Sequence, residues 1–193
     1  WRIARHKDDP SLLEIRRAED GLRAWASEPG EYYNAFDGAY GGLWRRSGRA
    51  PQQLVGIGFT AQGTFDGMPY HRVCYDKTFD WVFEGIDDDL IGDFGFSGNG
   101  AAGFELDRID LKLDSGHDIT ILAQAFASEE KFILVPEEQL THLTNLSGGP
   151  EGDVKRADMV YFETPGGGTV FSVGSITFCG SLPWNNFENN VSR

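Results

Sequence analysis

Short segments in which apolar and polar residues alternate follow one another along the chain, and few stretches repeat with the period of a helix. A period of two is typical of strands that bury one face. The pattern therefore predicts a fold dominated by strands. The expected strands cover residues 1–5, 12–16, 54–60, 72–75, 79–85, 93–96, 103–106, 119–126, 131–135, 159–164 and 169–176.

Helical patterns are fewer. Residues 19–26 and 137–143 are candidates, and the last residues, 185–193, resemble the first turns of a helix with Ser181 as its cap and Pro183 nearby. The run Pro165-Gly166-Gly167-Gly168 suits a tight connection between the last two strands.

Both ends of the sequence lie within such patterns, without an initiator Met or a polar lead-in. We therefore expect residues 1–193 to be part of a longer polypeptide and to form a single, incomplete domain. A long segment, residues 28–51, combines glycines with aromatic residues. Loops of that length are usually functional or form interfaces.

Composition narrows the class of protein. With 40% apolar and 24% charged residues, the sequence is typical of a soluble globular protein. Its apolar runs are far shorter than the roughly 20 residues needed to cross a bilayer, so no membrane span is expected. No apolar leader opens the sequence, which favours a cytoplasmic location. Two cysteines are too few for a disulfide framework.

The charge is strongly acidic. The chain contains 17 Lys and Arg residues and 30 Asp and Glu residues, which gives a net charge of −13. A negative charge of this size repels phosphate backbones and argues against nucleic acid as a partner. Residues 1–50 hold nine basic and eight acidic residues, whereas residues 51–193 hold eight basic and 22 acidic ones. Such an asymmetry is expected where a chain has two different faces or where one part of it faces a neighbour.

One segment matches the glycine pattern of dinucleotide-binding sites but lacks the helix that should follow it. Residues 98–103 read Gly-Asn-Gly-Ala-Ala-Gly, but the residues after them alternate like a strand. The dinucleotide mechanism needs a helix there, whose N-terminus receives the pyrophosphate. We therefore expect no dinucleotide site.

Acidic residues are dense between positions 84 and 110. Asp87-Asp88-Asp89 lacks the spacing of a calcium loop and is expected to be a solvated turn. Glu105 and Asp107 differ, because alternation places them on one face of a strand after a flexible loop. A carboxylate held there could act as a general base toward water. The alternative is a surface salt bridge to Arg108, to Lys112 or to a partner chain.

Other chemistry-bearing residues give weaker patterns. The four histidines lack metal-ligand spacing, so the chain itself predicts no metal site. Cys179 follows a candidate strand, where a nucleophile could lie, but no His or acid supports it. Cys74 and Cys179 are therefore expected to be small buried side chains.

Several longer motifs run in a fixed order over nearly the whole chain. They include Gly41-Gly42-Leu43-Trp44-Arg45, Gly100-Ala101-Ala102-Gly103-Phe104-Glu105-Leu106-Asp107-Arg108, Arg156-Ala157-Asp158-Met159-Val160-Tyr161 and Phe178-Cys179-Gly180-Ser181-Leu182-Pro183. Together they resemble the C-terminal part of the large (beta) subunit of N,N-dimethylformamidase. The shared order is a stronger indication than any one of these motifs.

The resemblance implies a hydrolase of small formamides, an amidase that releases formate and dimethylamine from N,N-dimethylformamide. It also implies a non-haem iron held by tyrosines and a carboxylate, all upstream of Trp1, so that no iron ligand is assigned to this chain. Glu105 would then lie near the iron site and orient or deprotonate the attacking water.

The resemblance implies further that the chain is the latter part of a glutamine-amidotransferase-like α/β domain, with residues 169–176 as a late strand and β-rich insertions ahead of it. The expected fold class is thus mixed α and β, dominated by strands. The implied partners are a small amide substrate, a small subunit and further large subunits in a hetero-oligomer. The alternative function is a non-catalytic β-rich module for subunit assembly, or an inactive relative, which the aromatic loop at 32–44 and the charge asymmetry suggest.

Overall fold

The computed structural model of the chain describes residues 2–16, 49–111, 113, 115–128, 130–135 and 154–193. The chain divides into two compact units, Trp1–Ala50 and Pro51–Arg193. The helices expected at 19–26 and 137–143, and the loop at 28–51 except for its last three residues, lie outside the described residues. Within the described part, no helix combines the length and the apolar character that crossing a membrane requires.

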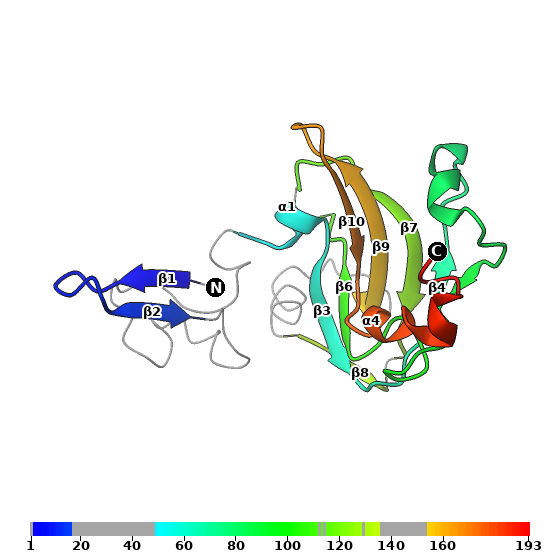
Figure 1. The fold of residues 1–193 in the computed structure, drawn as a ribbon, viewed down its shortest axis with the longest axis horizontal. Helices are drawn as coiled ribbons and strands as arrows, with labels where there is room; N and C mark the ends of the chain where they lie inside the picture. Colours follow the sequence, from blue (N-terminus) through cyan, green and yellow to red (C-terminus); the bar gives the residue numbers. More distant parts are fainter. Residues whose placement is uncertain (1, 17–48, 112, 114, 129, 136–153) are drawn as a thin grey trace. The chain divides into compact units, whose positions relative to one another are not determined.

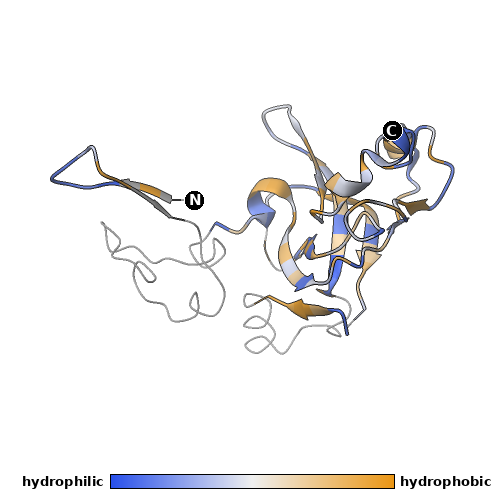
Figure 2. Cartoon of the chain, turned by 60° about the horizontal axis from the view of Figure 1, so that its bottom comes forward, coloured by the Kyte–Doolittle hydropathy of each residue, from blue (hydrophilic) through white to orange (hydrophobic). Residues whose placement is uncertain are grey.

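The first unit contains a β-hairpin. Strand β1 (Arg2–Arg5) pairs antiparallel with β2 (Leu13–Arg16), which confirms two of the expected strands. The turn between them is hydrophilic (Figure 2) and is closed by Asp9. Its Oδ1 accepts hydrogen bonds from the amide and the hydroxyl of Ser11 at 3.0 and 2.6 Å. These bonds lower the pKa of Asp9 below its ordinary value.

A five-stranded antiparallel sheet is the larger of the two sheets in the second unit (Figure 1). Its strands, in spatial order, are β10 (Thr169–Val173), β9 (Arg156–Glu163), β7 (Thr120–Phe126), β4 (Tyr70–Arg72) and β5 (Leu90–Ile91). The connection at 165–168 closes a β9–β10 hairpin, as the sequence predicts. There the amide of Thr164 donates to the carbonyl of Gly168 at 2.7 Å.

A second, three-stranded sheet has the order β6 (Glu105–Arg108), β3 (Gly58–Gly63) and β8 (Phe132–Leu134). The other edge of β6 meets the residues after β10. The amide of Asp107 donates to the carbonyl of Gly174 at 2.8 Å, and Leu106 bridges to Ser175. Strand β6 therefore joins the two sheets of this unit.

The core between these strands is built from small and medium side chains. Alanines 123, 125 and 157 on β7 and β9 are fully buried, and so are the larger side chains Leu106, Leu122 and Tyr70. Where β6 approaches the end of β10, the close spacing requires glycine. A Cβ on Gly174 would clash with the carbonyl oxygen of Asp107 and would lie 2.8 Å from the amide nitrogen of Asp158.

The strand expected at 79–85 is wrong. Lys77–Phe83 forms a 3₁₀ helix, η3, because the Asp76 carboxylate caps it by accepting a hydrogen bond from the amide of Thr78 at 2.9 Å. The ring of Phe79 then packs edge-on against Tyr161, with ring centroids 5.6 Å apart. The apolar residues whose spacing suggested a strand therefore lie on a 3₁₀ helix.

The strand expected at 54–60 begins too early. Its first residues belong to α1 (Gln52–Val55), which ends at Gly56 in the left-handed conformation, with φ +82°. The strand expected at 93–96 is absent, because Gly92 and Gly95 turn the chain there with φ +68° and +155°. The strand expected at 72–75 lies too far along the chain, because β4 covers Tyr70–Arg72 and shares only Arg72 with it. The remaining expected strands of this unit are confirmed with ends shifted by up to three residues.

The helix expected at the C-terminus is also wrong. A short helix, α4 (Phe178–Ser181), is followed by η4 (Trp184–Phe187), inside which Asn185 and Asn186 have φ of +50° and +55°. Asparagine adopts this left-handed conformation more readily than most residues do. A right-handed helix cannot contain residues in that conformation. The asparagine-rich ending therefore forms a tight turn and not a helix.

Replacing Gly174 with Ala should destabilise the fold by about 1–3 kcal/mol, since the new methyl group forces β6 away from β9 and β10. Urea denaturation of the purified protein measures this change. Gly166→Ala is the matched control, because nothing lies within 4 Å of the Cβ it would add. Equal stabilities of the two variants would contradict the close approach at Gly174.

Candidate functional site

The carboxylates that the sequence singles out lie on β6, the strand that joins the sheets. Leu106 and Arg108 alternate with Glu105 and Asp107 along the strand and are buried, whereas Glu105 is half-buried. Opposite them on β3 are Gln62, which faces Glu105, and Phe59, which faces Asp107. The expectation that the two acids share one face of a strand is confirmed, although the strand begins two residues later than predicted.

The chain is pinned directly before Glu105. The hydroxyl of Ser175 donates to the carbonyl of Gly103 at 2.7 Å and also lies 2.8 Å from the Gly103 amide. Phe104 has φ +60°, and its ring stacks on Phe65 at a centroid distance of 4.2 Å. The glycine motif at 98–103 therefore leads into a strand, as predicted, and not into the helix that a dinucleotide site needs.

The carboxyl of Asp107 has an unusually high pKa for an aspartic acid. Burial raises the pKa of its carboxyl to about 7, and the neighbouring Glu105 carboxylate adds to the rise. Both effects disfavour the charged form of Asp107. Close to neutral pH this carboxyl is therefore able to hold or release a proton.

Tyr70 lies near the same carboxylate. It is fully buried, and burial followed by the charges of Asp107 and Asp158 raises the pKa of its phenol. The phenolic oxygen forms no hydrogen bond with the described residues, and the nearby backbone of Gly174 opposes part of the pKa rise. Buried hydroxyls without a partner are rare in folded proteins.

Asp158, by contrast, is fully satisfied. Its Oδ1 accepts from Arg156 Nε at 2.9 Å and from Gln124 Nε2 at 2.8 Å, while Oδ2 accepts from the amide of Ile109 at 2.9 Å. It has no exposed surface. This carboxylate ties β9 to β7 and to the end of β6, which is a structural role.

The salt-bridge alternative for Glu105 is not supported at Arg108. The Arg108 guanidinium lies 3.7 Å from Asp110, and its Nε donates to the Thr60 hydroxyl at 3.2 Å. Within the described residues Glu105 forms no ion pair. Lys112, the other intrachain candidate, lies outside them.

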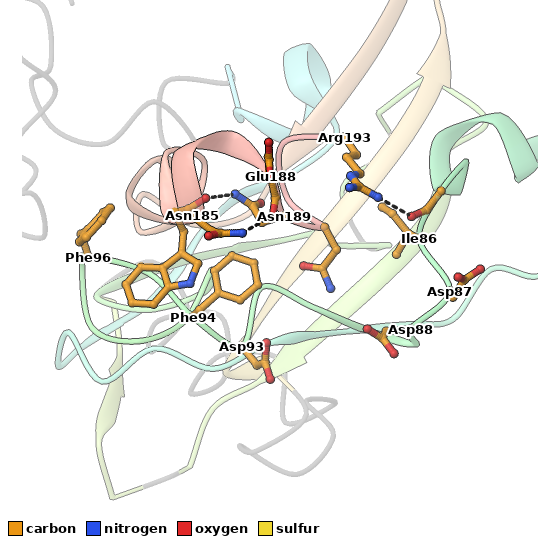
Figure 3. A pocket seen from close by; sticks show the side chains of 13 residues that line it. Ile86, Asp87, Asp88, Asp93, Phe94, Phe96, Asn185, Glu188, Asn189 and Arg193 are labelled. Atoms are coloured by element: carbon orange, nitrogen blue, oxygen red, sulfur yellow. Dashed lines mark hydrogen bonds between the residues drawn. The ribbon is translucent and has the colours of Figure 1, made fainter.

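A second feature, which the sequence patterns did not reveal, is a groove of about 660 Å³. It lies between the chain that follows η3, the turn after β5 and the C-terminal segment (Figure 3). We call it the C-terminal groove. It is lined by Gly85, Ile86, Asp87, Asp88, Asp93, Phe94, Phe96, Trp184, Asn185, Glu188, Asn189, Asn190 and Arg193.

Aromatic rings form one wall of the C-terminal groove. Phe94 stacks on Trp184 with centroids 5.9 Å apart, and Phe96 leans on the same indole at 5.0 Å. Two asparagines hold the opposite segment: Asn189 Nδ2 donates to the carbonyl of Trp184 at 2.6 Å, and Asn190 Oδ1 accepts from the amide of Gly92 at 3.0 Å. The groove is thus fixed by backbone contacts on both sides.

The sequence patterns did not predict this groove. Asp87 and Asp88 are exposed, as expected for a solvated turn, but the turn also lines the groove. Trp184 was missed because the C-terminal residues were expected to form a helix. The run of asparagines after it, which favours left-handed turns, was the signal that could have revealed it.

Other candidate side chains lead to no further site. In the ranges that the structure describes, no group of three or more His, Cys, Asp or Glu side chains could hold a metal ion. The expectation of two buried cysteines is wrong for Cys179, which is exposed on α4, while Cys74 is half-buried.

Comparison with known proteins gives one family. The model of N,N-dimethylformamidase beta subunit-like C-terminal regions matches residues 1–190. The chain is 39% identical to the N,N-dimethylformamidase beta subunit of Paracoccus aminophilus and 37% identical to that of an Alcaligenes species, each over 199 aligned positions. Both alignments cover 100% of this chain but 26% of the relative, so the chain spans about a quarter of their length.

Asp107→Asn should change how stability depends on pH. The pKa of Asp107 is raised on folding, so the wild-type protein loses stability as pH rises from about 4 toward 7, by up to about 4 kcal/mol from this group. Asn cannot ionise and removes this loss. Urea denaturation at pH 5 and pH 8 should therefore show the variant gaining on the wild type at pH 8.

Asp118→Asn is the control, because Asp118 is exposed on the surface. Its difference from the wild type should be the same at both pH values. A pH-independent difference for Asp107→Asn as well would contradict the raised pKa.

Proposed function

The chain belongs to the family of N,N-dimethylformamidase beta subunit-like C-terminal regions, and from this premise we propose that it is part of an amidohydrolase that acts on small formamides. The reaction adds water across the C–N bond, so that N,N-dimethylformamide gives formate and dimethylamine. The observation that carries the proposal is the match over the full chain to two dimethylformamidase beta subunits.

Iron is a separate part of the proposal. A non-haem iron, when bound, would polarise the amide carbonyl and lower the pKa of a bound water. The described residues offer no cluster of metal-binding side chains. The proposal therefore assigns no iron ligand to this chain and expects the tyrosines and the carboxylate that hold the metal in the remainder of the polypeptide.

Glu105 is the residue to which we assign a catalytic role, that of orienting the attacking water and accepting its proton. Three features support this choice. Its carboxylate is half-buried and forms no ion pair with the described residues, and the backbone before it is fixed by Ser175. Fixed geometry matters because general-base catalysis requires hydrogen-bond distance to the proton that is removed.

Asp107 adds to the same proposal. A carboxyl with a pKa of about 7 beside a second carboxylate resembles the acid and base pairs of hydrolases, in which different environments separate two acids. In this role Asp107 is a positioning residue whose proton state sets the charge beside Glu105.

The remaining parts of the proposal concern the assembly. The relatives are named beta subunits, which implies an alpha subunit beside them, and we propose a hetero-oligomer of large and small subunits in the cytoplasm. We also propose that this region ends a glutamine-amidotransferase-like α/β domain. The strand pairs of the described residues are antiparallel, so a parallel sheet of that domain would involve residues beyond them.

A second candidate function is a non-catalytic module for subunit assembly. Large apolar side chains on the surface favour it, among them Phe96 at 70%, Ile133 at 69% and Leu54 at 67% exposure. The sequence of the parent polypeptide distinguishes the two proposed functions. If it lacked the upstream tyrosines and the carboxylate that are expected to bind iron, the assembly module would be favoured.

Glu105→Gln in the full-length protein should lower the rate of dimethylformamide hydrolysis by about a hundredfold or more, because the amide cannot accept the proton of water. Formate release is measured at equal iron content and equal concentration of folded protein. Glu163→Gln, an exposed acid at the end of β9, serves as the control and should leave the rate unchanged. Unaltered turnover of Glu105→Gln would remove this residue from the mechanism.

A further inference from the structure

The C-terminal groove is the feature that the proposed function leaves unused. Its volume, about 660 Å³, lies within the range of small-molecule sites. Neither Glu105 nor Asp107 lines it. Its lining combines three aromatic rings with four carboxylates, and this combination restricts the chemistry of a ligand.

The electrostatics exclude an anion. Asp87, Asp88, Asp93 and Glu188 line the groove against one guanidinium, that of Arg193, which donates to the carbonyl of Gly85 at 3.4 Å. None of the four acids forms an ion pair with a residue that the structure describes. Their charges therefore attract a cation from solution.

The arrangement of the acids does not suit a metal ion. Figure 3 shows Asp93 beside Phe94, Asp87 and Asp88 along the wall to one side, and Glu188 on the opposite side. They do not converge, and the described residues contain no group of three or more acids, histidines or cysteines that could hold a metal. Dispersed carboxylates suit a cation whose charge is spread over a larger body.

The aromatic wall supplies the other half of the recognition. Trp184 is half-buried between Phe94 and Phe96, and Phe96 remains 70% exposed. Indole and phenyl faces attract alkylammonium ions, whose methyl groups lie against the rings while the charge interacts with the π electrons. A hydrated metal ion gains less from such a surface because it keeps its water.

The wall is fixed before any ligand arrives. Ser181 Oγ donates to the carbonyl of Phe94 at 2.6 Å, and the amide of Phe96 donates to the carbonyl of Gly180 at 3.0 Å. The backbone at Trp184 is held by Asn189, whose Nδ2 donates to the carbonyls of Leu182 and Trp184. A preformed site loses little entropy when it binds a small ligand.

From these observations we infer that the C-terminal groove binds a small organic cation of the methylated ammonium type, with Trp184 and Phe94 against its methyl groups and Asp93 nearest to its charge. Glu105 does not line the C-terminal groove. This inference can therefore be tested independently of the proposed formamide hydrolysis.

The test is ligand-detected saturation-transfer NMR of the full-length protein with tetramethylammonium chloride. Sodium chloride keeps the ionic strength constant, and tert-butanol serves as a neutral apolar probe. We expect the cation to bind and to be displaced by other methylated ammonium ions, with tert-butanol much weaker. Equal signals from tetramethylammonium and tert-butanol would overturn the inference, since the carboxylates would then contribute nothing.

Variants locate the binding. Trp184→Leu should weaken tetramethylammonium binding by about tenfold, and Trp184→Phe should restore most of it. Asp93→Asn should weaken binding several-fold, whereas Asp118→Asn, a surface acid outside the groove, should not. Because Asp93 is exposed, Asp93→Asn should fold normally. It therefore tests the site even if Trp184→Leu fails to fold. Wild-type affinity in Asp93→Asn, or in a folded Trp184→Leu, would contradict the site.

Discussion

The second unit depends on one close approach of two backbones. Strand β6 is paired with β3 on one edge, and on the other its Asp107 amide donates to the carbonyl of Gly174. This pairing leaves no space for a side chain at residue 174. Strand β6 belongs to the three-stranded sheet, and Gly174 directly follows β10 of the five-stranded sheet, so this contact joins the two sheets. The buried alanines of β7 and β9 allow the sheets to lie close together.

The same contact explains the chemistry of the β6 carboxylates. An acid on a strand between two sheets loses water on several sides, which raises the pKa of Asp107, and Glu105 two positions earlier adds its charge. Asp158 is more deeply buried but receives three hydrogen bonds, which compensate its charge. These hydrogen bonds give Asp158 a structural role, whereas Asp107 is the acid whose pKa is raised by burial and by Glu105.

The sequence predicted the parts of this arrangement that depend on local patterns. Alternation identified the hairpin and most strands, and it placed Glu105 and Asp107 on one face. It failed where a side chain caps the backbone: Asp76 converts the expected strand at 79–85 into η3, and asparagines after Trp184 replace a helix by left-handed turns. The C-terminal groove joins segments about a hundred positions apart, and no local pattern contains that information. Gly174 likewise gave no signal, because a glycine at the end of a strand does not reveal which strand will approach it.

Asp107 at the junction of the sheets, whose raised pKa allows it to exchange its proton near neutral pH, is central to the proposed site. Titration of the Asp107 side-chain carbon by ¹³C NMR, with the Asp107→Asn variant to assign the resonance, measures this directly. We expect an apparent pKa of about 7 for Asp107. A value close to the ordinary 3.8 would show that water reaches Asp107 freely, and it would contradict both the burial of this acid and its coupling to Glu105.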